Sequence, residues 1–499
     1  MDIISNLGLG FSIALSASNL LYCFIGVLLG TLVGVLPGLG PVASIAMLLP
    51  ITFVLPPESA LIMLAGIYYG AQYGGSTTAI LVNIPGESSS VVTAIDGYKM
   101  ARMGRAGPAL GIAAIGSFFA GCVSTIAIAY FAPLLTEVAL RFGPAEYFSL
   151  MVFGLIAAVV LARGSLLKAI AMIVLGLLLG LVGTDLNSGT ARYSFGVPEL
   201  TDGLGFIAIS MALFGIAEVI ANLETDQNQD VTAQPIGRAL PTWQDLKTST
   251  PSILRGTVLG SLLGVLPGGG ALLASFASYM LEKKVARLPR NFGQGDIRGV
   301  AGPESANNAG AQTSFIPMIT LGVPSNPTMA LMIGALMVQG INPGPTVMVE
   351  RPGLFWGLIA SMWIGNLMLL VLNLPLVRIW IKLLKIPYRV LFPAILAFCV
   401  IGVFSSSNNV FDIYLLAGLS LLGYIFIKLD CEPAPLILGF ILGPMMEENL
   451  RRAMLISRGS ASTFITQPIS LSFLIASLVM LFVVIVPAVR EKREEALQE

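Results

Sequence analysis

The sequence contains no histidine, and this absence excludes several classes of enzyme. Ser-His-Asp hydrolases and HExxH metallopeptidases both require that side chain. Charged residues are scarce as well, because Asp, Glu, Lys and Arg make up only 11% of the chain, and 27 basic residues balance 27 acidic ones. No basic excess is available to attract nucleic acid. We therefore expect neither a hydrolytic enzyme nor a nucleic-acid-binding protein.

Cysteine is also rare. The four cysteines are scattered and form no CxxC pair, so they predict neither a disulfide framework nor a metal cluster. We interpret them as small side chains buried in apolar runs, and we expect no organic cofactor. They are Cys23, Cys122, Cys399 and Cys431.

Long apolar runs dominate what is present. Hydrophobic residues make up 56% of the chain, and its mean hydropathy is +0.87. A membrane-spanning helix needs about 20 mostly apolar residues, and uncharged runs of that kind recur along the sequence. Strand-like alternation is absent, so helices must satisfy the backbone in lipid. The sequence predicts an all-α polytopic membrane protein with roughly a dozen transmembrane segments. Examples of such runs are 111–131, 353–377, 390–410 and 470–489.

A helix-breaking cluster occurs twice, as GVLPGLGP at 34–41 and as GVLPGGGA at 264–271. Further proline landmarks follow each copy in the same order, which predicts an internal repeat. We divide the chain into a first membrane repeat (1–223), a polar cytoplasmic linker (224–251), a second repeat (252–430) and C-terminal membrane segments with a charged tail (431–499). The paired prolines are Pro37 with Pro267, Pro85 with Pro324, and Pro108 with Pro345.

Basic residues indicate how the two repeats are oriented. The first repeat has Lys99, Arg102 and Arg105 after its second landmark, whereas the equivalent segment 328–344 has no charge. After the first landmark the bias reverses, because 42–57 is uncharged and 283–298 contains five basic residues. Since Lys and Arg collect on the cytoplasmic side, equivalent loops lie on opposite faces, and the repeat is predicted to be inverted.

The two clusters predict where a ligand binds. Their flanks, 26–36 with 42–55 and 256–266 with 272–281, look too short to span, so we predict broken or re-entrant hairpins that meet near the midplane. The alternative is that these glycines only allow close helix packing. In a broken helix, exposed backbone N–H groups and positive dipole ends can hold an anion without Lys or Arg. The predicted substrate-binding residues are Gly38, Gly40, Asn83, Pro85, Gly86, Ser88, Ser89, Gly268, Gly269, Gly270, Pro324, Ser325 and Asn326.

Oxygen-bearing side chains near the same landmarks are candidate ligands of a coupling cation, with Na⁺ expected. Glu87 and Glu304 are candidate coupling carboxylates because ionisable groups inside membranes are usually functional. Equally, Glu87 could cap the following helix and Glu304 could lie at a wet mouth. Asp96 is expected to pair with the adjacent basic loop. The predicted ion ligands are Thr77, Glu87, Ser88, Gln312, Thr313 and Asn326.

Two long segments resemble a known family. They are GVLPGLGPVASIAMLLPITFVLPPESALIMLAGIYYGAQYGGSTTAILVNIPGESSS at 34–90 and GVAGPESANNAGAQTSFIPMITLGVPSNPTMALMIGALM at 299–337. Both are similar to the large permease subunit of tripartite tricarboxylate transporters, and the resemblance covers nearly the whole chain. It implies a secondary transporter of the bacterial inner membrane that imports citrate-like tricarboxylates, dicarboxylates or related organic anions with a cation, usually sodium.

The resemblance also implies two protein partners, a small integral-membrane subunit and a periplasmic solute-binding protein, and it leaves the oligomeric state open. We expect elevator-type alternating access. Two other functions remain as alternatives: an uncoupled organic-anion uniporter or channel, and a membrane-embedded acyl or glycosyl transferase. The second would need a titratable catalytic cluster, and the missing histidine and the few intramembrane acids oppose it.

Overall fold

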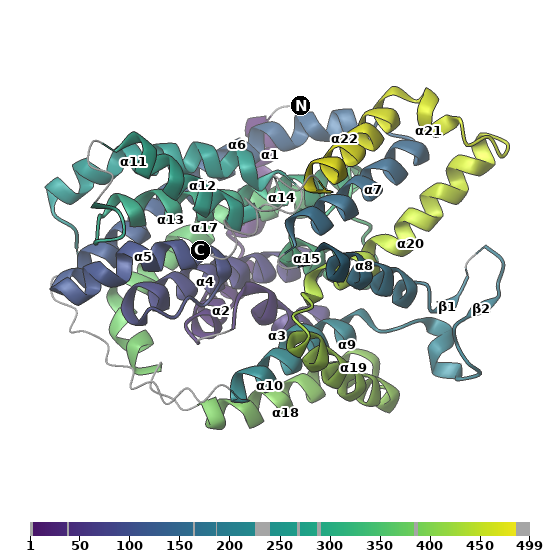
Figure 1. Cartoon of the computed structure of the whole chain (residues 1–499), viewed down its shortest axis with the longest axis horizontal. Coiled ribbons are helices and arrows are strands. Elements are labelled where there is room, and N and C mark those ends of the chain that lie inside the picture. Colours follow the sequence, from purple (N-terminus) through teal and green to yellow (C-terminus); the bar gives the residue numbers. More distant parts are fainter. Residues whose placement is uncertain are drawn as a thin grey trace.

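The computed structural model describes residues 3–36, 39–162, 165–185, 187–224, 240–266, 270–286, 291–383 and 388–485. These residues are almost entirely helical (Figure 1), so the predicted all-α class is confirmed. A single antiparallel pair of two-residue strands, β1 (Gly183–Thr184) and β2 (Ala191–Arg192), occurs among them, and it projects at the edge of the view in Figure 1.

The helices of the first half lie before residue 225. They are α1 (Ile3–Ala14), α2 (Ala17–Gly34), α3 (Pro41–Phe53), α4 (Pro57–Val82), η1 (Ser88–Ser90), α5 (Val91–Met100), η2 (Ala101–Arg105), α6 (Ala106–Ala139), α7 (Pro144–Leu161), α8 (Leu166–Gly180), η3 (Pro198–Asp202), α9 (Phe206–Ser210), η4 (Met211–Ile216) and α10 (Ala217–Glu224).

The second half and the C-terminal part continue in the same manner. Their helices are α11 (Trp243–Gly264), α12 (Gly270–Val285), α13 (Arg298–Thr313), α14 (Phe315–Leu321), α15 (Pro327–Val338), α16 (Thr346–Glu350), α17 (Pro352–Leu383), α18 (Tyr388–Ser407), α19 (Val410–Lys428), α20 (Pro433–Ile456), α21 (Thr463–Thr466) and α22 (Pro468–Ile485).

Helix length and composition identify a multi-pass membrane protein. In the described part of the chain, five helical segments are long and apolar enough to cross a membrane, and seven apolar helices are shorter. The number of crossings stays a prediction, because a shorter helix can cross only part of a bilayer. The five long segments are Ala17–Gly34, Ser88–Ala139, Phe206–Glu224, Pro352–Val377 and Val410–Lys428.

Both proline-glycine clusters interrupt helices, as predicted. The first separates α2 from α3, and the second separates α11 from α12. The expectation that every flank is too short to span is wrong for α2, which begins at Ala17 and has 18 residues. Helix α11 is also longer than its flank, with 22 residues, but it is not among the five segments that are long and apolar enough to cross. Gly26 and Gly256 lie inside these helices instead of at their starts.

The start of α11 lies inside the segment that the sequence assigned to the linker. Thr242 caps this helix, because its hydroxyl accepts a hydrogen bond from the Asp245 backbone N–H at 3.2 Å. The Asp245 carboxylate in turn accepts a hydrogen bond from the Thr242 N–H at 3.0 Å. It also forms a salt bridge with Arg105 of the first half at 2.5 Å. A polar sequence therefore begins a helix here because a complete capping box is present.

The two halves build one helix pair twice, from matching residues. Glycines four residues apart on α2 face backbone carbonyls of α4, and glycines on α11 face those of α13. A Cβ on Gly30 would lie 2.3 Å from the Ile67 carbonyl oxygen, and one on Gly260 would lie 2.3 Å from that of Ala306. The contacting pairs are Gly26 with Met63, Gly30 with Ile67 and Gly34 with Ala71, and then Gly256 with Gly302, Gly260 with Ala306 and Gly264 with Gly310.

These contacts repeat with the spacings of the proline landmarks, 230 residues for α2 and α11 and 239 residues for α4 and α13. The GAQ strings at 70–72 and 310–312 differ by 240, so they lie one residue out of this register. Gln72 and Gln312 are therefore not equivalent positions. The opposite orientation of the two repeats stays a prediction.

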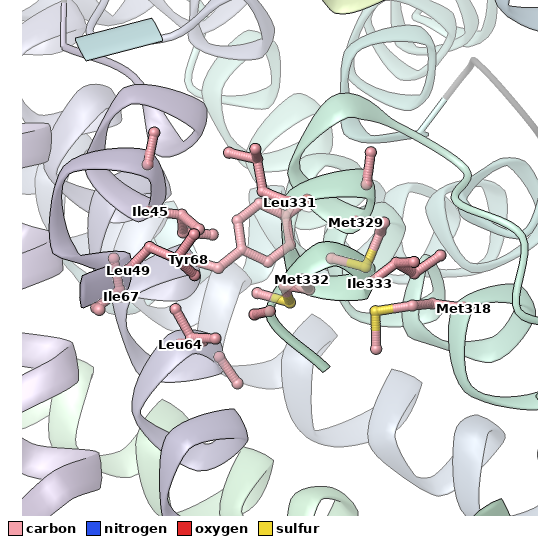
Figure 2. Close-up of a cluster of buried hydrophobic side chains, with 14 of the residues drawn as sticks. Ile45, Leu49, Leu64, Ile67, Tyr68, Met318, Met329, Leu331, Met332 and Ile333 are labelled. Carbon is pink, nitrogen blue, oxygen red and sulfur yellow. The ribbon is translucent and has the colours of Figure 1, made fainter. Parts of the chain in front are cut away.

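A shared apolar core holds the halves together. Ile45 and Leu49 of α3 and Tyr68 of α4 pack toward Leu331 and Met332 of α15 (Figure 2). All five side chains are at most 2% exposed. Because close van der Waals packing holds helices together within a membrane, this core fixes α3 and α4 relative to α15. The helix starts beside it are thereby held in place.

Candidate functional site

A cavity of about 620 Å³ lies where the landmarks of both halves meet. Segments that are far apart in the sequence line it together, which agrees with the expectation that the two halves share one site. Its lining includes 40–43 after the first cluster, 85–89 after α4, 270–272 after the second cluster and 326–328 before α15, together with residues of α4, η4, α10, α19 and α20.

Four helices begin at this cavity in addition to the short η1 and the α5 that follows it. Gly40 is the N-cap of α3, Asn326 is that of α15, and Glu432 is that of α20, while Gly270 is the first residue of α12. All four residues line the cavity. A helix N-terminus acts as about half a positive charge and presents free N–H groups. Together the four ends supply about two positive charges and an anion-binding surface without basic side chains.

Close backbone approaches form the walls of the cavity. Gly86 lies between the end of α2 and the middle of α4, where a Cβ would be 2.6 Å from both the Gly34 carbonyl oxygen and the Gly75 Cα. In the second half, a Cβ on Gly270 would lie 3.2 Å from Asn326 Nδ2. In each half, therefore, the region of the proline-glycine cluster contacts the segment of the second proline landmark, at Pro85 in the first half and at Pro324 in the second.

Three carboxyl groups line the same cavity, those of Glu87, Glu218 and Glu432, and none of the described residues lining it is Lys or Arg. When ionised, Glu87 and Glu218 alone carry two negative charges, which offset the roughly two positive charges of the helix ends. An organic anion would add further negative charge. Cations or protons are therefore needed in the cavity before an anion can be held there.

Oxygen atoms without partners surround Glu87. Asn307 of α13 donates from Nδ2 to Glu87 Oε1 at 3.0 Å, which leaves Asn307 Oδ1 unpartnered. Gln72 Oε1 and Ser89 Oγ are likewise buried without a partner within the described part of the chain. Carboxylate, amide and hydroxyl oxygens are the ligands that hard cations prefer. This side of the cavity is therefore chemically suited to a cation.

Glu304 lies apart from the large cavity. It is 1% exposed and accepts a hydrogen bond from the Thr93 hydroxyl at 2.5 Å. The interpretation that Glu304 lies at a wet mouth is therefore wrong. Glu87 is the N-cap residue of η1, but its side chain makes no capping hydrogen bond, so the simple capping role is wrong too.

Asp96 does not pair with the basic loop as expected. It is fully buried, and it accepts hydrogen bonds from the Tyr279 hydroxyl at 2.9 Å and from the backbone N–H groups of Gly295 at 2.7 Å and Asp296 at 2.9 Å. These donors all belong to the second half. Asp96 therefore joins the two halves, and backbone N–H groups replace the expected cations.

The structure gathers eight of the predicted residues around the large cavity and places others elsewhere. Asn83 is exposed and ends α4 in the left-handed conformation with φ 58°. The Ser325 hydroxyl donates to the Ser314 carbonyl at 3.3 Å, and Pro324 lies next to it outside the cavity lining. Gln312 and Thr313 are buried in α13, and Thr77 lines a different, small cavity. Gly38, Gly268 and Gly269 lie outside the described residues. The predicted residues that line the large cavity are Gly40, Pro85, Gly86, Glu87, Ser88, Ser89, Gly270 and Asn326.

Several lining residues escaped sequence reasoning. Glu218 is an isolated acid at the end of the apolar run 204–217, and an intramembrane carboxylate of this kind is a signal that could have been used. Asn307 does not line the cavity but donates a hydrogen bond to Glu87, which does; it follows Glu304 by three residues in the polar string PESANN, so the same argument applies to it. Tyr68, Gln72 and Glu432 carry no comparable pattern.

Two helical halves that enclose a polar cavity among apolar helices define a multi-pass membrane protein of the transport class. The chain belongs to the tripartite tricarboxylate transporter TctA family, whose model matches residues 20–438. Membership implies that it is the large subunit of a tripartite system that also has a small membrane subunit and a periplasmic binding protein.

Two curated relatives from Agrobacterium vitis are similar to this chain. An "uncharacterized 52.8 kDa protein in TAR-I ttuC' 3'region" is 58% identical over 499 residues, covering 100% of this chain and 99% of the relative. An "uncharacterized protein in TAR-II ttuC' 3'region" is 59% identical over 240 residues, covering 48% of this chain and 99% of the relative. No solved structure matches the chain.

Proposed function

We propose that the protein is the large permease subunit of a binding-protein-dependent secondary transporter, which imports tricarboxylates or related organic anions across the bacterial inner membrane by cation symport. Sodium is the proposed coupling ion. The periplasmic binding protein delivers the anion, and the cavity between the two halves receives it.

The observation that carries this proposal is the convergence of four helix starts with the carboxyl groups of Glu87 and Glu218 on one cavity, whose described lining contains no Lys or Arg. Helix ends attract the anion, and the carboxyls repel it unless cations bind or protons neutralise them. Anion binding therefore depends on cation binding at the same place. A cavity of this charge pattern supports symport over uncoupled passage.

Transport by reconstituted protein tests the proposal. The full chain, its small membrane subunit and the cognate binding protein are placed in proteoliposomes, and uptake of radiolabelled citrate and of smaller organic acids is measured with and without a sodium gradient. We expect accumulation above equilibrium only with the gradient. Uptake that reaches equilibrium at the same rate without any cation gradient would favour the alternative, a uniporter or channel.

The proposal includes alternating access by an elevator-type movement of the two broken helices, with the repeats inverted in the membrane. Membrane-impermeant thiol labelling of intact cells tests the orientation at two exposed positions, Asn342 and Arg102. A cysteine at position 342 should react from outside, and a cysteine at position 102 should not. The reverse pattern, or equal labelling, would contradict the inverted arrangement.

A further inference from the structure

A second and much smaller cavity lies between the two halves, separate from the large one. It offers about 10 Å³, roughly the space that one water molecule needs. Its lining shares no residue with the large cavity. Residues of α4, α6, α13 and α17 form it, and its polar members are Tyr73, Ser76, Thr77, Glu304 and Asn373.

Apart from the Tyr73 hydroxyl, the neutral polar groups in this lining are Ser76, Thr77 and Asn373, whose side chains each already donate a hydrogen bond elsewhere. The Ser76 hydroxyl donates to the Gln72 carbonyl at 3.3 Å, and the Thr77 hydroxyl donates to the Tyr73 carbonyl at 3.2 Å. Asn373 donates from Nδ2 to the Leu369 carbonyl at 3.0 Å. Its Oδ1 is buried and has no partner among the described residues, and the side chain is only 4% exposed.

Glu304 adds a carboxylate to these oxygens. It is 1% exposed, and within the described ranges it forms no ion pair with Lys or Arg. A buried carboxylate needs a counter-charge or a proton. Water alone offers two hydrogens, fewer than the acceptors present, whereas a cation can satisfy all the oxygens at once. We infer that Glu304, Asn373, Ser76 and Thr77 form a binding site for one monovalent metal cation, with Na⁺ as the ion that fits.

Charge and size both favour a monovalent ion. Divalent ions such as Ca²⁺ usually collect several carboxylates and six to eight oxygens, and Mg²⁺ keeps several of its waters. Here one residue with a carboxyl group and three residues with neutral side-chain oxygens line a space of about the size of one water. Hydroxyl and amide oxygens are ligands for hard cations, so Na⁺ meets the chemistry without further charge.

The site is connected to the large cavity through α13 and α5. Asn307, three residues after Glu304, hydrogen-bonds Glu87 in the large cavity. Thr93, six residues after Glu87, hydrogen-bonds Glu304. A cation at Glu304 therefore favours one arrangement of the segments that carry Glu87. This coupling role rests on the proposed function, whereas cation binding at Glu304 does not.

Sodium-dependent thermal stability of the purified full-length protein tests the site without any organic anion. NaCl should raise the melting temperature of the wild type more than choline chloride does at equal ionic strength. Asn373→Leu and Thr77→Val should each raise the half-maximal sodium concentration about tenfold or more, because a ligand is lost. Thr77→Ser keeps the hydroxyl and should behave like the wild type, and Glu304→Gln should abolish the sodium response.

Asn366 provides a matched control on the same helix. It is also 4% exposed, and it donates to the carbonyl four residues earlier, that of Met362, at 2.8 Å. Asn366→Leu should leave the half-maximal sodium concentration unchanged, even if the melting temperature falls. Equal sodium responses in wild type, Asn373→Leu and Thr77→Val would overturn the site. The site would also be overturned if low pH, but not sodium, stabilised the wild type and this stabilisation were lost in Glu304→Gln, because that result defines a proton site.

Failure of the proposed function gives a different result. If uptake in proteoliposomes does not depend on sodium, while sodium still stabilises the wild type and not Glu304→Gln, the cation site is supported and sodium symport is contradicted. If uptake depends on sodium but the sodium response of Asn373→Leu and Thr77→Val equals that of the wild type, symport stands and this site is wrong.

Discussion

Asn307 donates a hydrogen bond from Nδ2 to Oε1 of Glu87 at 3.0 Å, although the two residues belong to different repeats and lie 220 positions apart. The bond connects α13 of the second half with the loop that follows α4. In the packing register of the two halves, Asn326 occupies the position that corresponds to Glu87. The duplicated framework therefore carries an acid in one half and an amide in the other.

The Asn307–Glu87 contact predicts energetic coupling between these residues. Asn307→Ala and Glu87→Gln should each weaken sodium-dependent uptake, and the double variant should lose less than the two single losses combined, because Asn307→Ala removes the bond that Glu87→Gln weakens by removing the charge of its acceptor. A hydrogen bond to a charged group contributes about 1.5–3 kcal/mol, so the coupling should exceed measurement error. Uptake at varied sodium concentration measures it.

Asn308 serves as the control for that cycle. Its amide donates to Ser117 at 2.7 Å and to the Glu304 carbonyl at 3.0 Å, not to Glu87. The effects of Asn308→Ala and Glu87→Gln should add within about 0.5 kcal/mol. Strictly additive effects for Asn307 as well would show that the bond has no functional role.

Two serines near the landmarks should differ in their effect on substrate affinity. Ser88 lines the large cavity, whereas the Ser325 hydroxyl is bonded to Ser314 behind it. Ser88→Ala should raise the dissociation constant of the transported anion about tenfold or more, because one hydrogen bond to a charged ligand is lost. Ser325→Ala should leave it unchanged. Equilibrium binding to purified protein in saturating sodium measures both, and equal dissociation constants would remove Ser88 from the site.

The duplicated helix pair predicts matched losses of stability. Gly30→Ala and Gly260→Ala each place a Cβ 2.3 Å from a backbone oxygen of the partner helix, so the helices must separate. Overpacking of this kind costs about 1–3 kcal/mol and should lower the melting temperature of the purified protein. Gly8→Ala is the control, since nothing lies within 4 Å of a Cβ there. Loss at one glycine only would show that the two pairs are not equivalent.

The pairing of the β1–β2 hairpin with α20 should weaken in acid. Outside the candidate spans, the Ser188 hydroxyl, the Asn187 N–H and the cations Arg451 and Arg192 lower the pKa of Asp185 from 3.8 to about 2. A lowered folded-state pKa adds stability above pH 4, and this stability is lost as the pH falls toward 2. Asp185→Asn should lower hydrogen-exchange protection of residues 183–192 at pH 7, and the difference should vanish near pH 2. A constant difference across this range would contradict the prediction.

The sequence predicted the all-α class and the two helix breaks because these depend on local signals. Proline and glycine interrupt helices wherever they cluster, so the breaks after Gly34 and Gly264 could be placed from the residues alone. The charge balance of the cavity could not be predicted from local signals. Glu218 and Glu432 reach the cavity from α10 and from the start of α20, and neither helix follows one of the proline landmarks. Helix starts were also misjudged, since Thr242 begins α11 by a capping box inside a polar segment.

Pairing partners of buried acids were predicted least well. Asp96 was assigned to nearby lysines and arginines, yet it is bound by Tyr279 and by backbone N–H groups nearly 200 residues away. Glu304 was expected to lie at a water-filled mouth, yet it is buried and accepts a hydrogen bond from the Thr93 hydroxyl of the other half. Such contacts depend on how the two halves dock, and no local periodicity reports that arrangement.

The central claim is that residues of both halves line one substrate cavity, where helix ends bind the anion once cations have bound. The most direct measurement is substrate protection of two single cysteines, Ser88→Cys in the first half and Thr328→Cys in the second, in protein lacking the four native cysteines. An exposed distant position, Ser460→Cys, is the control. Thiol labelling at 88 and at 328 should be slowed by the transported anion in sodium and not in choline, with no change at 460. Protection of only one of the two cavity positions, or equal protection without sodium, would contradict the account.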